Sequence, residues 1–248
     1  MKILSIGNSF SQDAHRWLHS LAASENDNID TYNLYIGGCT LERHWECIEN
    51  NLKDYDKEGN DGKFLCKSSV SEALRDDTFD VITLQQASGF SGKPQSYIPY
   101  LSDISEFVKK YQPKAKIYFH KTWSYEIDST HEHFKFYNSN QKEMFCRISD
   151  SSEMALKLIG GEIIPVGDVI QSLRESTKEF DYAGGGLSLC RDGFHLSLLY
   201  GRFAAAATWY KVLTGKEADT EKFAEQNPSF NIFLLNVIVN SIKKMVII

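Results

Sequence analysis

The sequence alternates short apolar runs with amphipathic segments, and this alternation limits the possible folds more than any other feature. The apolar runs are too short for buried helices and lie at 2–6, 32–36, 79–84, 116–120 and 162–166. Strands that alternate with helices form a mostly parallel sheet with helices on both faces. We therefore predict an α/β fold of three layers, α/β/α, whose sheet has about five parallel strands.

The segments between these runs have the residue spacing of amphipathic helices. We expect helices at about 14–22, 41–52, 97–111, 141–159, 169–174 and 195–213. A polar stretch at 54–70, with Gly59 and Gly62 near its centre, indicates an inserted turn or hairpin. An apolar stretch at 229–248 indicates a C-terminal helix that docks on the body of the protein. We predict a single domain over residues 1–248.

Composition and charge argue against several classes of function. The net charge is −6 without a basic stripe, so nucleic acid is not an expected partner. Asn236, Asn240, Lys243 and Lys244 interrupt the C-terminal apolar stretch, so we do not expect it to span a membrane. Five cysteines without a C-x-x-C pair give poor support for a zinc site or a disulfide framework. No secretory signal is visible, so we expect a cytoplasmic protein, or an exported one whose signal peptide was removed.

Small polar residues follow the first predicted strand, in G-N-S-F-S at 7–11. In an open α/β sheet, binding and catalytic sites form at the carboxyl ends of the strands. Ser9 lies at such an end and at the start of a predicted helix. A serine in this position commonly caps the helix, and the stretch by itself favours that interpretation. The turn can also cradle an anion, or Ser9 can be a nucleophile.

A second group of reactive residues stands at the start of the last long predicted helix, in D-G-F-H-L-S at 192–197. A serine nucleophile needs a base, and an imidazole base needs an acceptor that fixes its tautomer. Asp192 and His195 are three residues apart, so a loop-to-helix junction can turn both side chains to one side. Alternatively, Asp192 caps the helix and His195 is an ordinary residue of its first turn.

The two motifs together resemble those of the SGNH hydrolase superfamily, also called GDSL-like esterases. The resemblance covers most of the chain in the order of its elements. Two further motifs, L-Q-Q-A-S at 84–88 and T-W-S-Y at 122–125, are similar to those of a Bacteroidetes-type branch. The resemblance implies a flavodoxin-like fold and a Ser-His-Asp triad. In it, Ser9 is the nucleophile, His195 the general base and Asp192 the residue that orients the base.

The resemblance also implies an oxyanion hole at the ends of three strands. The backbone amides of Ser9 and Gly38 match two of its donors, although Gly38 can equally serve only to end a strand. The family's third donor is an asparagine side chain, and this sequence has Gln85 and Gln86 at that place. Either amide can complete the hole, and we favour Gln85 because it directly continues the strand. Asn8 replaces the aspartate of the family's G-D-S, which is not a triad member.

Other residues near the strand ends are candidates for substrate binding. Trp123 and Tyr125 follow the fourth predicted strand, where they can line a sugar-sized pocket or pack against a helix. Asn8 lies in the nucleophile turn, and His44 lies near the loop after the second strand. The triplet His-Glu-His at 131–133 suggests a metal, but it offers no evident third ligand. We therefore expect a solvated loop there and no metal site.

Taken together, these features predict a serine esterase that hydrolyses small ester groups through an acyl-enzyme. The family analogy favours O-acetylated carbohydrate as the substrate and implies that no metal or organic cofactor is needed. Two alternatives remain open. One is a flavodoxin-like protein whose first turn binds a phosphate or a flavin. The other is a catalytically weak glycan-binding relative of the esterases, which the altered sequence after the third strand favours.

Overall fold

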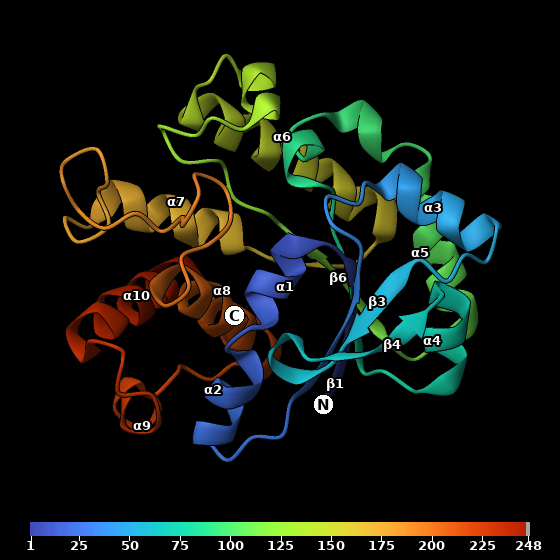
Figure 1. Cartoon of the computed structure of the whole chain (residues 1–248), viewed down its shortest axis with the longest axis horizontal. Helices are drawn as coiled ribbons and strands as arrows, with labels where there is room; N and C mark the ends of the chain where they lie inside the picture. Colours follow the sequence, from blue (N-terminus) through green and yellow to red (C-terminus); the bar gives the residue numbers. More distant parts are fainter. Residues whose placement is uncertain (247–248) are drawn as a thin grey trace.

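A computed structural model of the chain describes residues 1–246, and its centre is one mostly parallel sheet (Figure 1). The seven strands have the order β4-β3-β2-β1-β5-β6-β7. Their bounds are β1 Lys2–Gly7, β2 Asp30–Tyr35, β3 Tyr55–Glu58, β4 Phe64–Ser68, β5 Val81–Leu84, β6 Lys116–His120 and β7 Glu162–Ile164. The predicted parallel strands are all present, as β1, β2, β5, β6 and β7. The prediction of about five strands is too low, because an edge hairpin adds two more.

The two additional strands come from the polar insertion at 54–70. β3 and β4 pair antiparallel, and a short 3-10 turn, η1 (Asn60–Gly62), connects them. Asp61 and Gly62 have φ values of 60° and 77°, in the left-handed region that a tight chain reversal uses. Because β3 also pairs with β2, the insertion extends the sheet at one edge.

Helices cover both faces of the sheet, which confirms the three layers (Figure 1). One face carries α1 (Ser9–His15), α2 (Leu18–Ser24), α7 (Val166–Ser176), α8 (Tyr200–Thr214), α9 (Thr220–Gln226) and α10 (Ile232–Met245). The other face carries α3 (Leu41–Glu49), α4 (Val70–Asp76), α5 (Tyr100–Tyr111) and the C-terminal part of α6 (Gln141–Ile159). Short 3-10 turns lie in the loops: η2 (Ser88–Phe90), η3 (Pro94–Tyr97) and η4 (Glu132–Tyr137). Within residues 1–246, no helix combines the length and the hydropathy that a membrane crossing needs.

Two hydrophobic cores lie between the layers, one on each face of the sheet. There are two because successive residues of a strand face opposite sides of the sheet. Ile3 belongs to the core under α1 and α8, whereas Leu4 and Ile6 belong to the core under α3 and α5. Ser5 is buried on the side of Ile3, where its hydroxyl lies 2.9 Å from His15 Nε2. The hydrogen bond compensates for burying the Ser5 hydroxyl and one nitrogen of the His15 ring.

The predicted helix at about 14–22 is in fact two helices, α1 and α2. The break falls at Arg16 and Trp17, and there the Trp17 indole donates a hydrogen bond to the Leu198 carbonyl at 2.9 Å. The break thus ties the N-terminal helices to the loop that precedes α8.

The helix predicted at 195–213 begins later, at Tyr200. The reason is that the backbone before it is already engaged outside a helix. The Leu196 amide donates to the Asp13 carboxylate at 2.8 Å, and the Ser197 amide donates to the Leu189 carbonyl at 2.7 Å. His195 therefore stands on an anchored loop and not on a helical turn.

The remaining predicted helices are present with adjusted bounds. The expected segments at 41–52, 97–111, 141–159 and 169–174 correspond to α3, α5, α6 and α7. The prediction for α6 matches the observed bounds, and α7 is longer than expected. The expected C-terminal helix corresponds to α10, and residues 247–248 of that prediction lie outside the described residues.

Candidate active site

Ser9 is the first residue of α1, directly behind the carboxyl end of β1. Asn8 provides the helix cap: its side-chain oxygen accepts the Phe10 amide at 3.0 Å, and its backbone amide donates to Ser11 Oγ at 3.1 Å. A Cβ atom on Gly7 would stand 2.2 Å from the same Ser11 oxygen, so the turn needs a glycine there. Because Asn8 caps the helix, the Ser9 hydroxyl is available to another partner.

That partner is His195. Ser9 Oγ lies 2.9 Å from His195 Nε2, and His195 Nδ1 lies 2.7 Å from Asp192 Oδ2. When Nδ1 donates to the carboxylate, Nε2 of the neutral ring is an acceptor that can take the Ser9 proton. The structure therefore brings the three residues of two distant motifs into one hydrogen-bonded chain.

The loop that carries His195 is fixed to the helix that carries Ser9. Asp13 lies on α1, one turn after Ser9, and its side chain is fully buried. Its carboxylate accepts hydrogen bonds from Arg191 Nη1 at 3.0 Å, from Arg202 Nε at 2.7 Å and from the Leu196 amide at 2.8 Å. A buried carboxylate with two cationic partners and a backbone donor is compensated for its desolvation. Asp13 thus sets the distance between the two halves of the site.

Asp192 is held in its ionised form. Partial burial disfavours the charge, but the hydrogen bonds that the carboxylate accepts from His195 outweigh burial and lower the pKa of Asp192 below its usual value. One of these comes from the His195 backbone amide at 2.8 Å, so part of the orientation of the carboxylate does not depend on the ring. An ionised Asp192 can stabilise a positive charge on the imidazole of His195.

A cavity of about 200 Å³ opens beside Ser9, and we call it the Ser9 cavity. It is lined by Asn8, Ser9, Phe10, Tyr35, Gly37, Gly38, Ser88, His131, Phe194 and His195. Within residues 1–246, the amide groups of Ser9 and Gly38 donate no hydrogen bond. Gly38 has a φ of 63°, which favours glycine at this position. Two unpaired backbone donors in one small cavity can receive a negatively charged oxygen.

Neither of the two glutamines predicted to complete the oxyanion hole lines the Ser9 cavity. Gln85 is buried, and its Nε2 donates to Asn8 Oδ1 at 2.7 Å while its Oε1 lies 2.7 Å from His120 Nδ1. Gln86 Nε2 donates to the Ser96 carbonyl at 2.8 Å, away from the cavity. The prediction fails because both amides are used to hold loops together. Gln85 instead positions Asn8 and, through it, the nucleophile turn.

Three candidate substrate residues are buried and do not line the Ser9 cavity. Trp123 stacks on Phe10 with ring centroids 4.1 Å apart, and Tyr125 lies in the same core. His44 is fully buried, with Nδ1 2.8 Å from the Tyr55 hydroxyl, and burial lowers its pKa to about 3. All three side chains are therefore part of the protein interior. For Trp123 and Tyr125, of the two predicted alternatives, packing is correct and the lining of a sugar-sized pocket is not. Asn8 does line the cavity.

The residues of the His-Glu-His triplet at 131–133 differ in their exposure and in their distance from the site. Within the described part of the chain, no group of side chains has the composition of a metal site. His131 is half-buried and lines the Ser9 cavity, whereas Glu132 is exposed. The expectation of a wholly solvated loop is therefore wrong for His131. No local sequence pattern predicts this, because the loop reaches the cavity only through tertiary packing.

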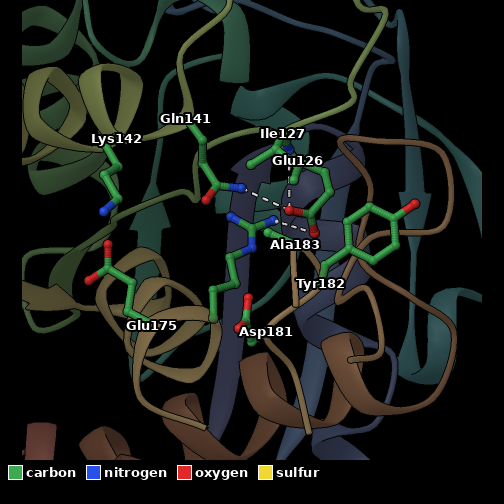
Figure 2. A pocket seen from close by; sticks show the side chains of 9 residues that line it. Glu126, Ile127, Gln141, Lys142, Glu175, Asp181, Tyr182 and Ala183 are labelled. Carbon is green, nitrogen blue, oxygen red and sulfur yellow. Dashed lines mark hydrogen bonds and ion pairs between the residues drawn. The ribbon is translucent and has the colours of Figure 1, made fainter. Parts of the chain in front are cut away.

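A second cavity, of about 430 Å³, is lined by Glu126 from the loop after β6 and by residues 181–183 from the loop after α7, and we call it the Glu126 cavity (Figure 2). Glu126 and Arg174 form an ion pair at 3.3 Å, with side chains 2% and 4% exposed. Glu126 also accepts Gln141 Nε2 at 2.8 Å, and its backbone amide donates to the Gly193 carbonyl at 2.8 Å. This network supports the turn between Asp192 and His195 from behind.

Sequence reasoning missed Asp13, Ser88 and His131. Asp13 had a usable signal, because an acidic residue four positions after Ser9 on the apolar side of a helix needs a buried partner. Ser88 and His131 had no such signal in the sequence, because they lie in loops and reach the cavity only through tertiary packing.

Comparison with known proteins identifies one family. A family profile described as a domain of unknown function, DUF4886, matches residues 2–231. A DUF4886 family protein from Bacteroides uniformis, of known crystal structure, is 34% identical to this chain. The match covers 98% of this chain and 95% of that one, with a TM-score of 0.83.

More distant solved structures share the fold. A protein from Slackia heliotrinireducens assigned to the SGNH hydrolases is 19% identical, with a TM-score of 0.60, over 86% of this chain and 98% of its own. An acetyl xylan esterase from Geobacillus stearothermophilus is 12% identical, with a TM-score of 0.55, over 88% of this chain and 96% of its own. None of the curated proteins compared matches the sequence.

Proposed function

Because this chain belongs to the DUF4886 family and has the fold of the SGNH hydrolases, we propose that it is a serine esterase that acts on small esters. One observation carries the proposal: the chain of hydrogen bonds from Ser9 through His195 to Asp192, at 2.9 and 2.7 Å. A cap or a structural histidine needs no such chain, whereas nucleophilic catalysis does.

The proposed reaction proceeds in two halves. Ser9 Oγ attacks the ester carbonyl while His195 Nε2 removes its proton, and Asp192 stabilises the imidazolium that forms. The amides of Ser9 and Gly38 hydrogen-bond the developing oxyanion. His195 then gives its proton to the leaving alcohol, and the acyl group remains on Ser9. Water, deprotonated by the same histidine, attacks the acyl-enzyme and releases the acid.

For the substrate we propose an O-acetylated carbohydrate. The Ser9 cavity has a volume of about 200 Å³, which favours a short acyl group over a long chain. Its walls include Tyr35, whose hydroxyl suits the hydroxyls of a sugar. The acetyl xylan esterase with the same fold is a precedent for this chemistry on such a scaffold.

The test is a comparison of ester hydrolysis by the wild type with that by Ser9→Ala and His195→Ala. We expect turnover of p-nitrophenyl acetate by the wild type, weaker turnover of the octanoate, and loss of both in each variant. Release of acetate from an acetylated xylo-oligosaccharide tests the substrate class separately. Wild-type protein that hydrolyses none of these esters, yet binds the oligosaccharide, would instead indicate a glycan-binding protein. The same turnover in Ser9→Ala as in the wild type would exclude the mechanism.

A further inference from the structure

The Ser9 cavity lacks the third oxyanion donor on the side where strand β5 ends. Gln85 and Gln86 follow β5, and both amides are bonded away from the cavity. The polar side chains that line the cavity from this side are Ser88 and His131. Ser88 Oγ is paired with the Tyr125 hydroxyl at 2.9 Å, in a bond that either hydroxyl can donate, so Ser88 is the less available donor of the two. His131 is therefore the group to consider.

The loop that carries His131 is clamped onto the end of β5. It belongs to the connection between β6 and α6, and its 3-10 turn η4 packs against η2. The Tyr137 hydroxyl donates to the Gly89 carbonyl at 3.0 Å and accepts the Gly92 amide at 3.0 Å. A Cβ atom on Gly89 would stand 2.2 Å from His133 Nδ1, so the two loops meet as closely as a glycine allows. The position of His131 is thus fixed by tertiary contacts.

The tautomer of His131 is also fixed. The His133 backbone amide donates to His131 Nδ1 at 3.1 Å, so Nδ1 is an acceptor and the proton of the neutral ring is on Nε2. Burial first, and the neighbouring His133 next, lower the pKa of His131, which favours the neutral ring. Within residues 1–246, Nε2 forms no hydrogen bond. A residue that lines the cavity therefore has a donor without a protein partner.

On the premise of the proposed esterase activity, we propose that His131 is the third oxyanion donor, with its Nε2–H bonded to the ester oxygen as Ser9 attacks. In this proposal the His131 imidazole, from the connection between β6 and α6, takes the place of the side-chain amide predicted at the end of β5. A neutral imidazole can polarise a carbonyl in this way, and it does so without placing a second positive charge beside His195.

The aromatic surroundings of His131 fit this role. Its ring contacts Phe194 edge to face at 4.6 Å and Tyr125 at 4.8 Å. Phe194 in turn lies against His195, with centroids 4.1 Å apart. Rings on these sides exclude water, and a hydrogen bond to a developing charge is stronger where water is excluded.

The test uses four variants and p-nitrophenyl acetate. Loss of one oxyanion donor lowers kcat about 100-fold to 1000-fold, so we expect this fall in His131→Ala, with KM changed less than about threefold. His131→Gln keeps a side-chain donor and should recover part of the lost kcat. His133→Gln keeps the backbone amide that orients His131 and should stay within about twofold of the wild type. Ser88→Ala removes the competing donor, and kcat should fall far less in this variant than in His131→Ala. Thermal melting of each variant shows that the protein is folded.

The outcomes separate this inference from the proposed function. Wild-type activity that is lost in Ser9→Ala but retained in His131→Ala would overturn only the role of His131. A large fall of kcat in Ser88→Ala, with His131→Ala unaffected, would assign the donor to Ser88 and also overturn it. A change in KM alone, or no recovery in a folded His131→Gln, would reduce His131 to a binding or packing residue. A wild type without any esterase activity would overturn both proposals.

Discussion

Two cavities of this protein, the Ser9 cavity and the Glu126 cavity, differ in how the polar groups at their centres are paired. The Glu126 cavity is the larger, about 430 Å³ against about 200 Å³, and charged residues line it (Figure 2). At its floor, both oxygens of the Glu126 carboxylate accept hydrogen bonds, from Gln141 and Arg174 among others. In the Ser9 cavity, the amides of Ser9 and Gly38 have no partner within residues 1–246.

This difference teaches that volume and charge are poor guides to where chemistry takes place. A charged group that is saturated by its neighbours is stable and unreactive, because it has no capacity left for a substrate. Donors without partners occur at both cavities, because Arg174 Nε in the Glu126 cavity has none within residues 1–246. Only those of the Ser9 cavity lie beside a hydroxyl that is hydrogen-bonded to a histidine. We therefore assign reaction to the Ser9 cavity and support of the Asp192 loop to the Glu126 cavity.

The largest expected effect separates Asp192, the partner of His195, from a carboxylate at the rim of the Glu126 cavity. Asp192→Asn should lower kcat on the order of 10⁴-fold, because an asparagine cannot hold His195 in the required tautomer and cannot stabilise its charge. Asp181→Asn, at the rim of the Glu126 cavity, is the matched control and should change kcat less than about twofold. Steady-state hydrolysis of p-nitrophenyl acetate measures both. Equal losses in the two variants would remove the distinction between the cavities.

The second effect is a loss of stability, and it is expected for a substitution in the Glu126 cavity. Arg174→Met leaves the buried Glu126 carboxylate without its cation and should lower the free energy of unfolding by about 3 to 5 kcal/mol. Arg43→Met breaks exposed ion pairs to Glu46 and Asp54 and should cost less than about 1 kcal/mol. Urea unfolding measures both values. A loss in Arg174→Met as small as that in Arg43→Met would mean that the ion pair does not support the loop.

The third effect is a pH dependence of the free energy of unfolding, and it comes from two buried histidines, His15 and His120. Burial lowers the pKa of His15 to about 3, and burial, with His15 next, lowers that of His120 to about 3. The folded pKa lies below the unfolded one, so protons bind preferentially to the unfolded chain. Each histidine should then remove up to about 1.4 kcal/mol of stability per pH unit as the pH falls below about 6.5.

Urea unfolding between about pH 6.5 and about pH 4.5 tests this, because most carboxylates remain ionised in that window. We expect a free energy of unfolding that decreases steadily over the whole window. A constant value would show that the buried histidines are not neutral.

The smallest expected effect tests whether the Glu126 cavity only supports the loop that carries Asp192 or also binds substrate. Lys142→Ala removes an exposed cation from its rim and should leave both kcat and the free energy of unfolding nearly unchanged, within about 0.5 kcal/mol. The measurement is kcat/KM on an acetylated xylo-oligosaccharide and on p-nitrophenyl acetate. A several-fold loss on the oligosaccharide alone would contradict the assignment and indicate that this cavity binds sugar.

Much of the fold followed from periodicity, because strands buried on both faces and long amphipathic helices have strong local patterns. All parallel strands and α6 were predictable for this reason. The start of α8 was not, since a buried carboxylate on α1, that of Asp13, holds the chain before it. No local pattern contains a contact between residues more than 180 positions apart.

The candidate site shows the same division. Ser9, Asp192 and His195 were predictable because two short motifs carry them, and the structure brings them together. The roles of Gln85 and His131 were not, because both depend on which loop folds over the end of β5. A side-chain amide has several possible partners, and its sequence position does not select one.

The most direct test of the central claim is the labelling of the protein with a fluorophosphonate, followed by mass spectrometry of the intact chain and its peptides. The account predicts one adduct for each chain, on the peptide that contains Ser9. The adduct should be absent in Ser9→Ala and form much more slowly in His195→Ala. No adduct on the wild-type protein, or the same adduct on Ser9→Ala, would contradict the assignment of Ser9 as the nucleophile.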